Sequence, residues 1–142
     1  MLNNATKLLF LICCLSVSVA GPAVSFAQDE KEVHVAKADP DGVQRVRLVG
    51  GGYFLKPNRI VVKVNVPVEL SASREAGVTP HNLVIKAPEA GIAVEEELAT
   101  EVKKIMFTAT AVGKYPFYCS KKLLFFASHR ERGMEGVLEV VP

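Results

Sequence analysis

Short segments in which apolar and polar residues alternate recur between turn residues through most of this chain. Val43–Val49 reads VQRVRLV, Lys104–Thr110 reads KIMFTAT and Val137–Val141 reads VLEVV. Alternation with a period of two gives a β-strand one apolar face to bury and one polar face for water. Clusters of glycine, proline, aspartate and asparagine separate the segments, as turns require. The pattern therefore predicts an all-β protein, either a sandwich or a small barrel.

We expect about seven or eight strands and almost no helix. The segments with this pattern are 43–49, 53–55, 59–64, 68–72, 81–85, 104–110, 113–119 and 137–141, and 32–36 is a candidate for a further short strand. The glycine triplet Gly50–Gly52 predicts a bulge or a sharp bend. The segment Ile92–Thr100 (IAVEEELAT) contains an acidic run, which predicts a solvent-facing surface or a short helical turn.

The first 27 residues have the features of a secretory signal. Lys7 supplies positive charge, Leu8–Leu15 an apolar run and Ser25–Ala27 a small-x-small cleavage site. The apolar run is short for a membrane span, and an uncleaved anchor is the alternative. We expect residues 28–142 to form one domain that is exported to the periplasm, where it is a monomer without a membrane anchor.

The bulk composition offers no argument for binding nucleic acid or membranes. The 17 basic and 15 acidic residues give a net charge of +2, and the chain has no tryptophan. Removal of residues 1–27 takes away one lysine and no acid, which lowers the charge to +1 (16 − 15). A near-neutral chain lacks the basic surface and stacking platform that nucleic acids need.

The cysteine count is informative once the predicted signal is removed. Cys13 and Cys14 leave with it, so Cys119 is the one cysteine of residues 28–142. An internal disulfide is then impossible. An unpaired thiol in an oxidising compartment has to be buried or bound to a metal, and Cys119 alone does not decide between the two.

The segment Gly113–Gly136 carries Cys119, His129 and Met134, and His81 stands upstream after a proline. Thiolate and thioether are soft ligands that favour copper, and imidazole suits it. Two histidines with one cysteine and a weak axial methionine form the blue-copper set. Cys119 ends one predicted strand and Met134 precedes the last, so one loop would carry three of these side chains. His81 would reach the same end of the sandwich from another strand.

Three segments resemble plastocyanin. Tyr115–Ser120 (YPFYCS) is similar to the segment leading to its copper cysteine. His129–Gly136 (HRERGMEG) is similar to the segment with its second histidine and axial methionine, and Pro80–Asn82 to the segment with its first histidine. Together with 54–57 and 60–62, the resemblance to cupredoxins covers most of residues 43–142.

The resemblance implies a cupredoxin-like Greek-key β-sandwich that binds one copper ion. His81, Cys119 and His129 would be the equatorial ligands and Met134 the axial ligand. Asn82 would connect its own segment to the cysteine segment near Ser120 by hydrogen bonds. His129 would be the electron port and Tyr118 a second route for the electron.

The implied function is electron transfer between redox protein partners, with copper cycling between Cu(I) and Cu(II). The alternatives are a copper carrier that delivers the metal, and a metal-free interaction module. We do not expect an enzyme, because a copper oxidase would usually need an open coordination position or further copper ligands, and His34 is the one spare histidine.

The segment Lys121–Ala127 (KKLLFFA) makes the cysteine-to-histidine loop longer than in plastocyanin-like proteins. We expect its four large apolar residues, Leu123–Phe126, to pack on the sandwich as a turn of helix. The alternative is an apolar collar around His129 for partner docking. An oxygen ligand from Glu69, Glu75 or Glu131 is the alternative to Met134.

Overall fold

The computed structural model describes residues 32–142. The predicted signal and cleavage site, with residues 28–31, lie outside the described residues, so the domain boundary at residue 28 stays a prediction. The described residues form ten strands and one short 3-10 turn. No helix among them is long and apolar enough to cross a membrane.

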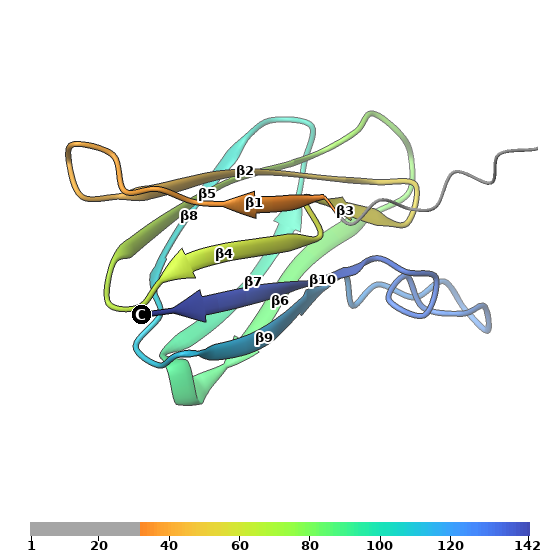
Figure 1. The fold of residues 1–142 in the computed structure, drawn as a ribbon. Helices are drawn as coiled ribbons and strands as arrows, with labels where there is room; N and C mark the ends of the chain where they lie inside the picture. Colours follow the sequence, from red (N-terminus) through yellow and green to blue (C-terminus); the bar gives the residue numbers. More distant parts are fainter. Residues whose placement is uncertain (1–31) are drawn as a thin grey trace, which may run out of the picture.

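The strands form two sheets that face each other as a sandwich (Figure 1). The larger sheet has the order β1-β4-β10-β9-β6-β7 and the smaller sheet the order β3-β2-β5-β8. In chain order the elements are β1 Val33–Val35, β2 Gln44–Gly51, β3 Phe54–Lys56, β4 Arg59–Lys63, β5 Pro67–Arg74, β6 His81–Ala87, η1 Pro88–Ala90, β7 Ile92–Leu98, β8 Lys103–Thr108, β9 Gly113–Tyr118 and β10 Glu135–Val141. The all-β sandwich is confirmed, and the expected number of strands was too low.

The core lies between the sheets and follows from the alternation in the sequence. In β2, Val46 and Leu48 point inward and are buried, whereas Arg45 and Arg47 point outward. Leu48 of the smaller sheet and Phe117 of the larger one are both fully buried. Each large apolar side chain that is buried in this way stabilises the fold by roughly 1.5–3 kcal/mol.

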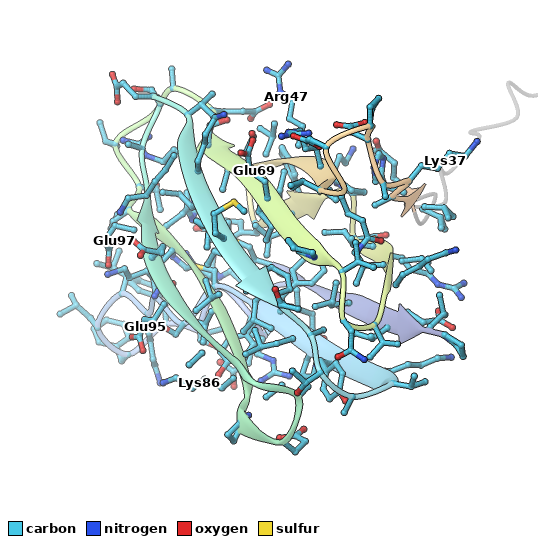
Figure 2. All side chains as sticks on the ribbon, turned by 90° about the vertical axis from the view of Figure 1, so that its left-hand side faces the viewer. Lys37, Arg47, Glu69, Lys86, Glu95 and Glu97 are labelled. Carbon is cyan, nitrogen blue, oxygen red and sulfur yellow. The ribbon has the colours of Figure 1, made fainter. Side chains whose placement is uncertain are left out.

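The acidic segment forms strand β7, so the prediction of a short helical turn was wrong. All seven residues of β7 pair with β6 in an antiparallel ladder. Val94 and Leu98 are buried, and Glu95 and Glu97 lie on the outer surface (Figure 2). The solvent-facing surface was therefore predicted correctly, and Lys86 pairs with Glu95 across it at 3.1 Å.

Strand β2 continues through the first two residues of the glycine triplet. Gly50 and Gly51 belong to the strand, and the bend comes after them at Gly52 and Tyr53, both with positive φ. A Cβ atom on Gly50 would lie only 3.1 Å from the terminal methyl group of Met134. Gly50 is thus a point of close packing, and its missing side chain leaves room for the methionine.

Four loops lie at the same end of the sandwich: 52–53, 75–80, 99–102 and 119–134. We call this end the long-loop pole, after the loop between β9 and β10, which extends beyond the sheets in Figure 1. Strands β6 and β10 begin there, and β9 ends there. Three of the four candidate ligands, His81, Cys119 and Met134, lie at or next to these strand ends, and His129 lies in the loop between β9 and β10.

Candidate metal centre

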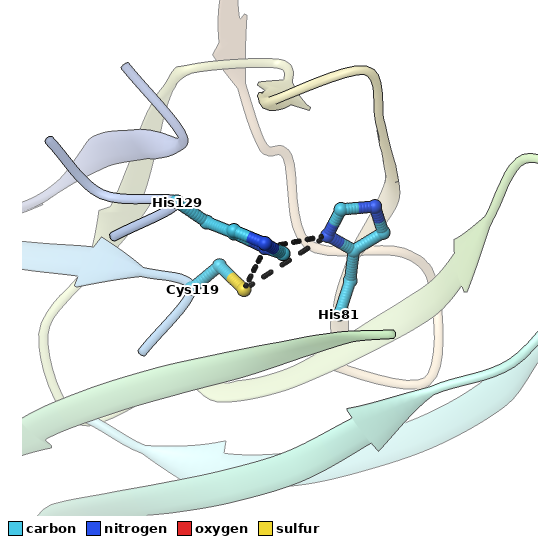
Figure 3. A group of neighbouring side chains, drawn as sticks. All are labelled: His81, Cys119 and His129. Atoms are coloured by element: carbon cyan, nitrogen blue, oxygen red, sulfur yellow. Dashed lines mark hydrogen bonds between the residues drawn. The ribbon is translucent and has the colours of Figure 1, made fainter. Parts of the chain in front are cut away.

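Three side chains from separate segments meet at the long-loop pole: His81, Cys119 and His129 (Figure 3). The Nδ1 atoms of the two histidines lie 3.1 Å apart. The Cys119 Sγ atom lies 3.4 Å from His129 Nδ1 and 4.0 Å from His81 Nδ1. All three residues are buried, with 5% or less of their surface exposed. One thiol and two imidazoles therefore face one another in a cluster that is almost entirely buried.

The pairing of β9 with β10 explains how Cys119, His129 and Met134 come together. Glu135 pairs with Tyr118, so the chain leaving β9 runs beside the chain entering β10. The Cys119 N–H donates to the Met134 carbonyl at 3.0 Å, and the Met134 N–H donates to the His129 carbonyl at 3.0 Å. Met134 is fully buried. These bonds continue the ladder into the loop and place the methionine beside both residues.

Asn82 joins the strand of His81 to the segment of Cys119. Its side-chain nitrogen donates to the Ser120 Oγ atom at 2.9 Å, and its Oδ1 atom accepts from the Ser120 N–H at 2.9 Å. The backbone N–H of Asn82 points at the Cys119 sulfur, 3.5 Å away. The resemblance to cupredoxins implied such a connection near Ser120, and the structure contains it.

The pKa values of both histidines in the cluster are lowered. Burial lowers the pKa of His81 below its ordinary value, and repulsion from His129 and Arg74 lowers it further. Burial also lowers the pKa of His129, with a smaller contribution from Arg132. A metal-binding imidazole has to be neutral, so the site favours the state of histidine that binds metal.

Tyr53 and Arg132 pack around His129, and the sequence analysis missed both. The Tyr53 ring meets the His129 ring edge-on, with centroids 5.1 Å apart. The Arg132 guanidinium lies over the Tyr53 ring, 4.6 Å from the ring centroid. The positive φ of Tyr53 directs its ring toward the pole, and the preceding glycines were the one sequence signal of that bend.

The three glutamates considered as oxygen ligands do not join the cluster of donor atoms. Glu69 forms ion pairs on the outer surface of β5. Glu75 packs against Gly51. Glu131 accepts hydrogen bonds from the backbone and side chain of Ser128 at 2.6 and 2.8 Å. Each carboxylate thus has another role, and the structure gives the oxygen-ligand alternative no support.

The prediction that Leu123–Phe126 packs on the sandwich as a turn of helix was wrong. The segment forms a turn closed by the Phe126 N–H and the Leu123 carbonyl at 3.0 Å, and all four side chains are exposed. The loop extends past the ends of both sheets, so no strand lies opposite it. Leu123 and Phe126 line a pocket of about 230 Å³ together with His129, as the alternative of an apolar collar predicts.

Comparisons with known proteins identify the fold. No family model matches the sequence, and no curated protein matches it. Among solved structures, the metal-binding domain of the Cu(I)-exporting P-type ATPase CopA of Streptococcus pneumoniae D39, solved with Cu(I), has a TM-score of 0.59 and 22% identity over 79% of this chain and 98% of its own. A copper-binding protein in its apo form has a TM-score of 0.58 and 21% identity over 78% and 99%. Auracyanin B has a TM-score of 0.55 and 18% identity over 75% and 94%. The chain therefore has the β-sandwich fold of the cupredoxins, as its sequence predicts.

Proposed function

We propose that the protein binds one copper ion and transfers single electrons. His81, Cys119 and His129 would be the principal ligands and Met134 the weak axial ligand. The convergence of one thiol and two imidazoles in a buried cluster carries the proposal. Similarity in fold to a metal-binding domain solved with Cu(I) and to a copper-binding protein supports it.

The donor set fits copper by its chemistry. Thiolate and thioether sulfur select soft metals, and imidazole suits copper. The backbone N–H of Asn82 is directed at the Cys119 sulfur, where it would stabilise the thiolate and tune the reduction potential. The fully buried Met134 adjoins Cys119 and His129 through backbone hydrogen bonds. Nothing in this arrangement requires an oxygen ligand.

The protein's own contribution is to hold the ligands in place. His81 is fixed by the β6–β7 ladder, and Cys119 and Met134 by the β9–β10 ladder. Copper, when bound, supplies the one-electron couple between Cu(I) and Cu(II). Because the sheets hold the side chains, the protein reorganises little when the charge changes, and no bond of a substrate has to be made or broken. The partners would be redox proteins.

Copper carriage is the second candidate function. One similar structure is a domain of a Cu(I) exporter that was solved with Cu(I). A carrier would use the same ligands but would exchange electrons slowly and pass the metal to a partner. Measurement of the electron self-exchange rate and of copper handover to an apo-acceptor separates the two functions.

Copper titration of the protein tests the proposal, with optical and EPR spectra as the readout. We expect a thiolate-to-copper absorption band in the visible range that Cys119→Ser abolishes. His81→Ala should weaken copper binding, whereas the matched control His34→Ala, in strand β1, should not. For the axial position, Met134→Leu should alter the spectrum and Met106→Leu, an exposed methionine, should leave it unchanged.

A thermal melt with and without copper tests the metal-free alternative. A ligand that binds only the folded state raises the melting temperature. A colourless protein with the same melting temperature in copper would refute the proposal and favour a metal-free interaction module. We also propose export to the periplasm as a monomer, on the basis of the N-terminal sequence; N-terminal sequencing of the exported protein tests the cleavage site after Ala27.

A further inference from the structure

The turn Leu123–Phe126 presents apolar side chains to solvent at the apex of the long loop. Leu124 and Phe125 are 75% and 83% exposed. Leu124 has a φ of +49°, in the left-handed region that leucine rarely adopts. Exposure and strain both cost free energy in water, and such costs persist where a segment has a function. The turn is therefore a candidate interaction site.

Two other loops of the long-loop pole add exposed apolar side chains. Val78 is fully exposed in the loop before β6, and Val102 is exposed in the loop before β8. These residues stand on separate loops. Separate apolar tips lack the close-packed shape that a protein interface needs, but they can enter a deformable apolar phase such as a lipid interface.

Basic side chains flank the apolar turn. The loop carries Lys121, Lys122, Arg130 and Arg132 against the single acid Glu131, an excess of three positive charges (4 − 1). Lys121 pairs with Glu97 and Arg130 with Glu135.

Within residues 32–142, Lys122 and Arg132 have no ion-pair partner. Cations without an ion-pair partner beside exposed leucine and phenylalanine match the chemistry of an anionic lipid surface.

The described chain also begins at this pole. Val33 of β1 and Val137 of β10 both pair with Arg59, the first residue of β4, and β10 begins directly after Met134. Residue 32, the first of the described residues, therefore lies on the same side of the domain as the apolar turn.

We propose that the long-loop pole docks on a lipid bilayer with anionic headgroups. Leu123–Phe126 enters the interface, and Lys122 and Arg132 lie against the lipid phosphates. Docking needs no metal, so it can be tested independently of copper binding. If copper binds as proposed, docking holds His129, which lines the pocket under the turn, close to electron-transfer proteins of the membrane.

The absence of tryptophan gives a direct test on the full chain. Phe125→Trp places a single tryptophan in the turn, and Val112→Trp places one at an exposed site at the opposite end of the sandwich, before β9. The metal-free proteins are mixed with vesicles of phosphatidylglycerol or phosphatidylcholine that contain brominated lipid. We expect a blue shift and quenching for Phe125→Trp with phosphatidylglycerol, a weaker response with phosphatidylcholine, and no response for Val112→Trp.

Further substitutions in the Phe125→Trp protein separate the contributions. Lys122→Gln should weaken vesicle binding about fivefold. The matched control Lys37→Gln, at an exposed site in the loop after β1, should not change it. Leu124→Ser should weaken binding roughly tenfold or more.

Three results would overturn the proposal. The first is unchanged Phe125→Trp emission with both kinds of vesicle, which would exclude a lipid surface and favour a protein as the partner of the turn. The second is equal quenching in Val112→Trp. The third is a blue shift that depends on protein concentration and needs no vesicles, which would assign the turn to contacts between two copies of the chain.

Discussion

Removal of the Asn82 side chain should destabilise the fold where β6 and β9 separate. The backbone ladder between these strands ends with Val84 opposite Tyr118. In the continuation of this register Asn82 lies opposite Ser120, and its amide makes two hydrogen bonds of 2.9 Å there. The side chain thus takes the place of the missing ladder bonds and holds the segments of His81 and Cys119 together.

The size of the effect follows from these two bonds. One intramolecular hydrogen bond contributes about 0.5–1.5 kcal/mol, and a backbone N–H left without an acceptor costs more. We therefore expect Asn82→Ala to lower the free energy of unfolding of the metal-free protein by about 2–3 kcal/mol. Ser120→Ala removes only the hydroxyl acceptor and keeps the bond from the Ser120 N–H to the amide oxygen. It should cost about 1 kcal/mol.

Urea unfolding of the two single variants and the double variant measures these energies. The double-mutant cycle should give a coupling of about 1 kcal/mol between the side chains. The metal-free protein is used so that a change in copper affinity does not enter the result. If Asn82→Ala costs no more than Ser120→Ala, the amide is not the connection that the structure indicates, and the reasoning fails.

Two further predictions concern packing and pH. A Cβ atom at Gly136 would overlap the Phe117 ring, so Gly136→Ala should cost about 3 kcal/mol or more in urea unfolding. Gly77→Ala is the control, because nothing lies within 4 Å of its Cβ position; equal costs would contradict the packing argument. Because the pKa values of His81 and His129 are lowered in the folded state, the unfolded chain binds more protons below about pH 6.5. The metal-free protein should therefore lose stability as the pH falls from 7.5 to 5, and urea midpoints that do not change over this range would contradict the assignment of neutral histidines.

The all-β sandwich and the meeting of the site residues could be predicted from the sequence for different physical reasons. The alternation of buried and exposed residues is local, so each strand carries its own signal. The residues of the cluster are far apart in the sequence. A lone cysteine, Cys119, together with its candidate partners His81 and His129 is nevertheless a rare combination, and its chemistry indicates a shared metal site. The structure brings these three together, and their binding of copper remains a proposal.

The two wrong predictions concern segments whose conformation depends on tertiary structure. In β7, three consecutive glutamates hid the alternation. The strand is fixed by its ladder with β6 and by three buried residues, Ile92, Val94 and Leu98. The run Leu123–Phe126 was assigned to the core because four adjacent apolar residues are usually buried. Its exposure depends on where the sheets end, and no local pattern in the sequence contains that information.

The apolar turn and the candidate metal centre belong to one loop, but a backbone hydrogen bond at the base of the turn separates them. The His129 N–H donates to the Lys121 carbonyl at 2.9 Å, so the chain returns to its starting point before the histidine. The Met134 N–H then bonds the His129 carbonyl. Residues 122–128 therefore form an excursion whose base, and not its apex, positions His129. Substitutions at Leu124 or Phe125 should change docking without changing the copper spectrum, which makes the two proposals separable in one set of variants.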